Sequence, residues 1–379
     1  MKDPSAYEGR EQTYLKHFFL ERYLETVAYH IGWFGDFVYV DGFSGPWRST
    51  DEAFEDTSIL IAIKKLRTVR NNLLKSGKRP NIRCVFVEKD RGAFEDLQRT
   101  TKNIDDIEVL VLNSDFETAV EQITAYVGQT FALTFIDPTG WTGFALDTIA
   151  PLLRKKGEVL INFMFEHLNR FKSDERDFIA QTYTKLFGGD GWQGHVEAGE
   201  AAMLDFYQRR IKERCGFDFA TRTRIMQPLK EKTYFHLVYA TRHPKGLKEF
   251  RRIEKRLTKE QGLVRATAQQ RNRIQKSGQL ELFSAADAES KSPSLADDTR
   301  SFSARAQTEL LALVHKKGSV FYEQALPALL EIPAIDETTA KSIICDLCEA
   351  RMLDIVPPLK DKRSRPKDGH ELRAVPQNQ

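Results

Sequence analysis

Short apolar runs of strand type alternate with helical patterns along the first half of the sequence, and this alternation limits the folds that the chain can adopt. The five predicted strands lie in "VYVDGF" (38–43), "IRCVFVEKD" (82–90), "IEVLVLNSDF" (107–116), "TFALTFIDPTGW" (130–141) and "EVLINFMF" (158–165). Several of these runs are continuously apolar, which is typical of strands buried on both faces. The sequence therefore predicts an α/β fold with a doubly wound, Rossmann-like parallel sheet.

Helical periodicity fills the intervals between these strands. We expect helices over 12–34, 56–75, 91–103, 117–128 and 146–157, the second of them with Asp56 as its N-cap. From about 170 to 227 the sequence reads as helical and polar, which predicts an insertion or cap on the same domain. A further strand is expected within 233–247, followed by a basic helix over 247–257.

The composition changes after residue 284. Residues 285–300 are small and polar, which is typical of a linker, so we expect a first domain over 1–284 and a second over 301–379. The second domain offers three helical patterns followed by strand, loop and strand. This order predicts a C-terminal winged helix-turn-helix domain, with Asp336 and Thr338 as candidate caps of its third helix.

The four cysteines do not form the pattern of a disulfide framework. Cys345 and Cys348 make a C-x-x-C, but they lie in a stretch of helical periodicity without a second Cys/His pair, so we predict a buried helix and no metal site. The N-terminus lacks an apolar signal core, and no stretch reaches the roughly 20 apolar residues of a bilayer span. We therefore expect a soluble, cytoplasmic protein.

Carboxylates end three successive predicted strands, at Asp41, Glu88 and Asp115. In an open parallel sheet, ligands bind beyond the carboxyl ends of the strands. The first strand runs into "DGFSGP", which lacks the G-x-G-x-x-G of dinucleotide binding, and its acid would repel a phosphate but attract an ammonium group. S-adenosylmethionine has a matching order of parts: Asp41 would face its amino-acid end, Glu88 the ribose hydroxyls and Asp115 the adenine amino group. The residues expected to shape the amino-acid site with Asp41 are Gly42, Phe43 and Gly45. The alternative is that the three acids merely cap the turns and helices that follow the strands.

The fourth strand ends in "FIDPTGW", where a methyl acceptor would be held. Asp137 and the carbonyl of Pro138 could accept hydrogen bonds from an acceptor amine, because proline fixes the local backbone. Trp141 could stack on a flat acceptor such as a nucleobase. An ordinary Asp-Pro turn with a packing tryptophan is the alternative interpretation.

Taken in order, several of these segments resemble one known family. "TYLKHFFLERYL", "YVDGFSGPW", "VFVEKD", "SDF", "FIDPTGW", "EVLINFMF" and "YATRHPKGL" are similar to the three-Cys-motif partner proteins (TcmP), a bacterial family with a methyltransferase-like Rossmann domain. The resemblance covers most of residues 1–285. It implies a Rossmann-like methyltransferase sheet and a partner protein with a three-cysteine, radical-SAM-like motif.

The resemblance also points to individual residues. Lys16 and His17 fall at the family's lysine–histidine position in the leading helix, which implies contact with the acceptor or the cofactor. Asp137 and Pro138 map onto the D/N-P-P-Y/F motif of amino-methyltransferases, although Thr139 replaces the second proline. Asn162, at the end of the fifth strand, faces the same crevice by topology and is a further candidate contact.

Basic residues are concentrated in 245–276 and in the C-terminal loop, and such clusters can bind DNA or RNA through phosphates. In the C-terminal domain the candidate nucleic-acid contacts are Lys341, Lys360, Lys362, Arg363 and Arg365. The leading hypothesis is an S-adenosylmethionine-dependent methyltransferase acting on or near nucleic acid. The alternatives are a non-catalytic nucleic-acid-binding adaptor with a Rossmann scaffold, and a nicotinamide oxidoreductase.

Overall fold

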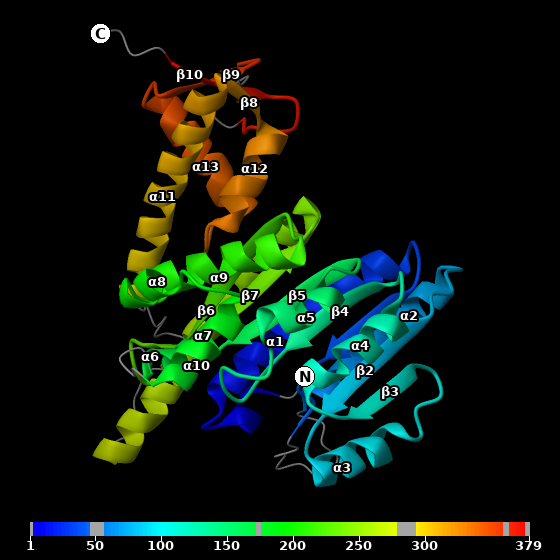
Figure 1. Ribbon diagram of the computed structural model, residues 1–379. Coiled ribbons are helices and arrows are strands. Elements are labelled where there is room, and N and C mark those ends of the chain that lie inside the picture. Colours follow the sequence, from blue (N-terminus) through cyan, green and yellow to red (C-terminus); the bar gives the residue numbers. More distant parts are fainter. Residues whose placement is uncertain (1–2, 46–56, 172–175, 279–292, 359–363, 376–379) are drawn as a thin grey trace.

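A seven-stranded sheet forms the centre of the computed structural model, which describes residues 3–45, 57–171, 176–278, 293–358 and 364–375 (Figure 1). Its strands lie in the order β3-β2-β1-β4-β5-β7-β6. Their bounds are β1 (Phe37–Asp41), β2 (Ile82–Glu88), β3 (Glu108–Asn113), β4 (Phe131–Ile136), β5 (Gly157–Phe163), β6 (Phe219–Met226) and β7 (Thr233–Thr241). β7 runs opposite in direction to the other six described strands of this sheet, since it pairs antiparallel with both β5 and β6. A doubly wound α/β sheet is thus confirmed.

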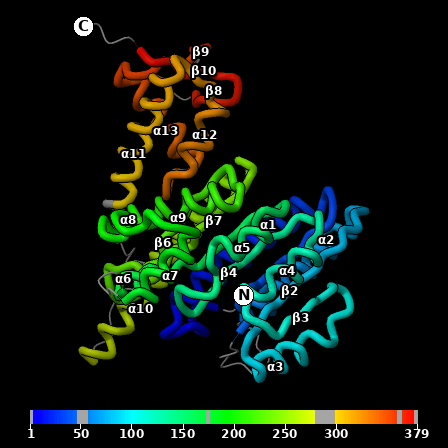
Figure 2. The backbone as a smooth tube through the Cα atoms, viewed as in Figure 1, coloured from blue at the N-terminus to red at the C-terminus, as the bar shows by residue number. Residues whose placement is uncertain are grey.

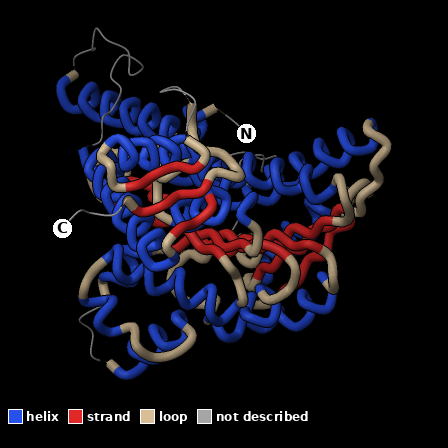
Figure 3. The backbone as a smooth tube through the Cα atoms, turned by 90° about the horizontal axis from the view of Figure 1, so that it is seen from above, coloured by secondary structure: helices blue, strands red, loops and turns tan. Residues whose placement is uncertain are grey.

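Alternate side chains of the central strands enter two separate apolar cores. In β1, Phe37 and Tyr39 belong to the core beneath α1 (Glu11–Gly32), α2 (Ser58–Lys75) and α10 (Pro244–Ser277). Val38 and Val40 belong to the opposite core, under α4 (Phe116–Val127), α5 (Leu146–Leu153) and α9 (Glu200–Cys215). The view from above shows the sheet between these helical layers (Figure 3). Because successive strand residues point to opposite faces, a continuous apolar run is what this double burial requires.

The remaining helices of this part are short. They are the 3₁₀ helix η1 (Pro4–Tyr7), α3 (Arg91–Thr101), α6 (Phe165–Asn169), α7 (Asp177–Phe187) and α8 (Gln193–Glu197). The first and last long helices, α1 and α10, pack side by side although they lie far apart in the sequence (Figure 2). Their rings meet at Phe19 and Phe250, with centroids 5.0 Å apart.

In the first domain, the structure differs from the sequence prediction at two places. The region from 170 to 227 is not helical throughout, because 219–226 forms strand β6. Arg222 and Arg224 give this strand a polar pattern, but Arg222 is buried and paired with Asp205 at 2.6 Å. At α2, Asp56 lies outside the described residues, and Thr57 is the N-cap, accepting a hydrogen bond from the backbone N–H of Leu60 at 3.4 Å.

In its described residues, 293–358 and 364–375, the C-terminal module contains three helices and a three-stranded antiparallel sheet. In chain order its elements are α11 (Pro293–Lys317), β8 (Ser319–Phe321), α12 (Tyr322–Glu331), α13 (Glu337–Glu349), β9 (Leu353–Val356) and β10 (Glu371–Ala374), with the sheet order β8-β10-β9. Helix α11 begins inside the expected linker 285–300. Asp336 caps α13 as predicted, accepting from Thr339 N at 2.7 Å, and both Cys345 and Cys348 lie on this helix.

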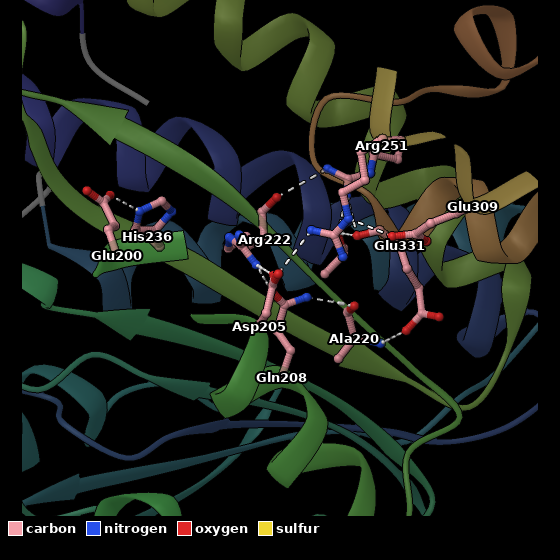
Figure 4. Close-up of polar contacts among 11 residues, drawn as sticks. Glu200, Asp205, Gln208, Ala220, Arg222, His236, Arg251, Glu309 and Glu331 are labelled. Atoms are coloured by element: carbon pink, nitrogen blue, oxygen red, sulfur yellow. Dashed lines mark hydrogen bonds and ion pairs between the residues drawn. The ribbon is translucent and has the colours of Figure 1, made fainter. Parts of the chain in front are cut away.

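Buried arginines attach this module to the edge of the large sheet (Figure 4). The Arg251 side chain of α10 is 1 % exposed. Its Nε donates to Leu330 O at 2.8 Å, and its Nη1 donates to Glu254 Oε2 at 2.5 Å and to Arg222 O at 3.2 Å. The Glu331 carboxylate of α12 in turn accepts from Ala220 N at 2.9 Å. One guanidinium therefore connects α10, the edge strand β6 and the end of α12.

We predict that Arg251→Ala lowers the free energy of unfolding by about 3–5 kcal/mol, because it leaves Glu254 and two carbonyls buried without their donor. Denaturant titration of the full chain measures this. The neighbouring Arg252, whose side chain is 45 % exposed and paired with Glu249, is the matched control. Arg252→Ala should cost no more than about 1 kcal/mol, and equal losses for the two variants would contradict the role given to Arg251.

Candidate functional site

A cavity of about 690 Å³ opens at the carboxyl ends of the parallel strands. It lies where β1 and β4 are neighbours, which is the point at which the strand order reverses direction and where open α/β sheets bind ligands. Its volume is within the range of small-molecule sites. The residues lining it are Arg10, Gln12, Thr13, Lys16, His17, Phe43, Ser44, Gly45, Thr57, Ser58, Ile59, Asp137, Pro138, Thr139, Asn162, Met164, Tyr234 and Phe235.

Asp137 is the centre of a polar cluster in the cavity wall. Lys16 Nζ of α1 donates to its Oδ2 at 2.5 Å, and Asn162 Nδ2 donates to its Oδ1 at 2.7 Å. The side chains of Lys16 and Asp137 are each 15 % exposed, so the ion pair is largely shielded from water. Three residues that the sequence analysis chose on separate grounds therefore meet at one point of the cavity.

The Asn162 side chain has one polar atom without a partner. The residue is 4 % exposed, and its Oδ1 has no hydrogen-bond partner among the described residues. A buried acceptor left in this state costs about 1–3 kcal/mol.

Asp41 lies behind the cavity wall rather than in it. It is fully buried, and its Oδ1 accepts from Phe43 N at 3.1 Å, while Ser58 Oγ donates to Oδ2 at 3.4 Å. Burial without an ion pair to the described residues raises the pKa of Asp41 to about 7, although the hydrogen bond from Phe43 N opposes this. Asp41 therefore holds the loop after β1 and places a titratable charge beside the cavity.

Glu88 and Gly45 lie in close contact. A Cβ at Gly45 would overlap Glu88 Oε2, and one at Gly42 would lie 2.8 Å from the ring of Phe116. Glu88 Oε1 accepts from Asp90 N at 2.6 Å, and burial raises the pKa of the Glu88 carboxyl. The small residues of "DGFSGP" thus let the loop pack on the acid at the end of β2.

His17 lines the cavity next to Lys16, as its position in the sequence implied. It is buried and shares a hydrogen bond of 3.3 Å between its Nδ1 and the hydroxyl of Tyr7. Burial and the neighbouring Lys16 charge lower the pKa of His17 to about 3. The imidazole is therefore neutral at pH 7 and cannot be the cationic group of the site.

Five of the predicted site residues, Asp41, Gly42, Glu88, Asp115 and Trp141, do not line the cavity. Asp115 is exposed and caps α4, accepting from Thr118 N at 3.0 Å, and this bond lowers the pKa of its carboxyl. Trp141 is buried between Phe171 and Tyr183, with ring centroids 5.7 and 4.9 Å away. In this arrangement its ring serves packing, as the alternative interpretation had it, and is not open to a stacked acceptor.

Several lining residues were not singled out from the sequence. Thr57 and Ser58 start α2, whose N-terminal end faces the cavity, and the Thr-Ser pair before a helical run was a signal that could have found them. Arg10 and Thr13 lie close to Lys16 in the sequence, whereas Tyr234 comes from β7, and none of the three was chosen as a site residue.

Comparisons with known proteins show no sequence family. Neither the protein-family models nor the curated proteins gave a match. Among solved structures, a Legionella pneumophila protein of the family model DUF519 aligns with a TM-score of 0.37 and 11% identity over 65% of this chain and 91% of its own. The CMeT domain of the citrinin polyketide synthase aligns with a TM-score of 0.27 and 11% identity over 55% of this chain and 46% of its own. A loganic acid methyltransferase with SAH aligns with a TM-score of 0.28 and 10% identity over 73% of this chain and 91% of its own. Similarities this weak carry no inference about function, which depends on the residues of the site.

We predict that Asp41→Asn stabilises the fold at alkaline pH. A raised carboxyl pKa means that the protonated form is favoured in the folded state, so the stabilisation is full below 3.8 and is lost as the pH rises through about 7. At about 1.4 kcal/mol for each pKa unit, the variant should gain on the order of 4 kcal/mol in unfolding free energy over the wild type at pH 8, and on the order of 2 kcal/mol at pH 5.

Denaturant titrations at the two pH values measure the difference. Asp137→Asn is the control, because it removes the ion-pair partner of Lys16 and should destabilise the fold at both pH values. An Asp41→Asn gain that does not depend on pH would contradict the raised pKa.

Proposed function

We propose that the protein is an S-adenosylmethionine-dependent methyltransferase. The observation that carries the proposal is the cluster of Lys16, Asp137 and Asn162 in the wall of a cavity at the carboxyl ends of β1 and β4, with Asp41 behind that wall. The strand order 3-2-1-4-5-7-6 with a single antiparallel strand, β7, is typical of such enzymes and supports it. The missing G-x-G-x-x-G argues against a nicotinamide cofactor.

The residues fit the parts of this cofactor. Asp41 and the loop over Phe43–Gly45 would hold the cationic amino-acid end, because a buried carboxylate with a pKa near 7 gains from a cation close by. Glu88, packed under Gly45, would accept hydrogen bonds from the ribose hydroxyls.

The cofactor supplies an electrophilic methyl group on a sulfonium. Asp137 and Asn162 would orient the acceptor, and Lys16 holds Asp137 in place. The assignment of Asp115 to the adenine stays a prediction.

Calorimetry of the purified chain with S-adenosylmethionine, S-adenosylhomocysteine and NAD tests the proposal. We expect micromolar binding of the first two, no binding of NAD, and loss of binding in Glu88→Ala. Transfer of a labelled methyl group to DNA, RNA or protein then separates a catalyst from a liganded scaffold. Binding of none of the three ligands would refute the proposal.

We predict that Gly45→Ala weakens S-adenosylhomocysteine binding at least about tenfold, a loss of about 1.4 kcal/mol, because the new methyl group would displace Glu88. Gly140→Ala is a matched control, since a Cβ at Gly140 meets no atom within 4 Å. The Gly140→Ala variant should bind S-adenosylhomocysteine with the affinity of the wild type. Equal affinities of the two variants would exclude a role for the Gly45–Glu88 contact.

We also propose that residues 293–375 form a winged helix that contacts nucleic acid. The order helix, strand, helix, helix, strand, strand supports this interpretation. Of the predicted contacts, Lys341 pairs with Glu337 at 2.9 Å, Arg365 lies near Cys345, and Lys360, Lys362 and Arg363 lie outside the described residues. On this basis the protein would work as an adaptor for a three-Cys-motif radical-SAM-like partner if it bound nucleic acid but no cofactor.

Within the described ranges, no helix combines the length and apolarity that crossing a bilayer requires.

Titration of a labelled DNA or RNA duplex with the protein at rising salt tests this contact. Each phosphate neutralised releases counterions, so the affinity should fall steeply as salt increases. Arg365→Ala should weaken binding and flatten this dependence. Affinity that is independent of salt would contradict phosphate contacts.

A further inference from the structure

A second cavity opens at the amino ends of the parallel strands, away from the candidate site. Phe131 and Gly157, which begin β4 and β5, line it, whereas Asp137 and Asn162 lie at the carboxyl ends of the same two strands. Its volume of about 660 Å³ is within the range of small-molecule sites. The residues lining it are Tyr23, Thr26, Val27, His30, Ile31, Phe131, Lys156, Gly157, Glu158, Thr241, Arg242, His243, Lys245, Gly246, Lys248 and Glu249.

The segment "TRHPKGL" (241–247), quoted in the sequence analysis and not used by the candidate site, supplies much of this lining. Arg242 fixes the segment to the chain that enters β5. Its Nη1 donates to Lys155 O at 3.0 Å and to Gly157 O at 3.3 Å, and its Nη2 donates to Leu153 O at 2.8 Å. The rim of the cavity is therefore held together by one guanidinium, whose partners here are neutral carbonyls.

Part of the cavity wall is apolar. Val27 and Ile31 of α1 lie in it together with Phe131 of β4, and Ile31 and Phe131 are only partly buried. Apolar side chains that stay partly covered in a concave wall gain free energy when an apolar ligand removes them from water.

The two acids that line the cavity are already engaged by the protein. Glu158 is buried, and its carboxylate accepts from the Tyr23 hydroxyl at 2.7 Å and from Thr241 Oγ1 at 2.9 Å. Glu249 pairs with Arg252 at 2.7 Å. Neither carboxylate is therefore left to attract a cationic ligand.

The cations that line the cavity exceed what these acids offset. Lys248 pairs with Glu337 at 3.5 Å, and Arg242 is held by backbone carbonyls. Lys156 and Lys245 are exposed, and neither side chain has a partner among the described residues. Both lysines are free to meet a negative charge at the rim of an apolar wall.

We propose that this cavity binds an organic anion with an apolar body. The anionic group would lie at Lys156 and Lys245, and the body would cover Val27, Ile31 and Phe131. A cation with the same body would be repelled by the lysines, and a small anion would leave the apolar wall uncovered. Because the cavity is separate from the candidate site, this inference does not depend on the function proposed above.

Calorimetry of the full chain with decanoate, decyltrimethylammonium and acetate separates the charge of a ligand from its apolar body. We expect decanoate to bind at least about tenfold tighter than either of the other two, which corresponds to about 1.4 kcal/mol. Rising salt should reduce the preference over decyltrimethylammonium, because it screens the lysine charges. Equal binding of decanoate and decyltrimethylammonium, or no binding of decanoate, would overturn the proposal.

Charge reversal locates the site. The double variant Lys156→Glu with Lys245→Glu should lose the preference for decanoate over decyltrimethylammonium, and both changes are at exposed positions. Lys102→Glu with Lys185→Glu is the matched control, since it makes the same change of charge at exposed lysines outside the cavity. A preference that survives in the first variant, or that both variants lose equally, would show that the lysines of the cavity do not hold the anion.

Discussion

Coverage of the large sheet by helices on both faces determines where this protein can meet a ligand. The side chains of β1 alternate between two apolar cores, so the body of the strand offers no polar group to a solute. Only the strand ends remain, and there the chain places Asp41, Glu88, Asp137 and Asn162. The reversal of strand order between β1 and β4 leaves a gap between the covering helices at this edge, and the cavity occupies it.

Electrostatics gives the two aspartates of the site different roles. Asp137 is neutralised by Lys16 across a chain separation of 121 residues, which keeps a charged carboxylate in a shielded place. Asp41 has only hydrogen bonds to neutral groups of the described residues, and its pKa rises to about 7.

Local sequence patterns predicted much of this arrangement because strand ends and caps are local features. The five parallel strands, the positions of Asp137 and Asn162 and the cap Asp336 follow from short segments. Strand β6 was missed because the charge of Arg222 hides a buried position, which a distant acid neutralises. The packing of Trp141 against Tyr183 and the pairing of Lys16 with Asp137 depend on contacts between remote segments, which no local pattern contains.

The packing of α1 against α10 has a consequence for synthesis of the chain. Helix α1 leaves the ribosome long before α10, because Phe250 and its neighbours, which complete the core around α1, follow more than 200 residues later. During this interval the apolar face of α1 has only part of its final cover, and transiently exposed surface of this kind promotes aggregation. The core around α1 is therefore complete only after translation has passed residue 277, where α10 ends.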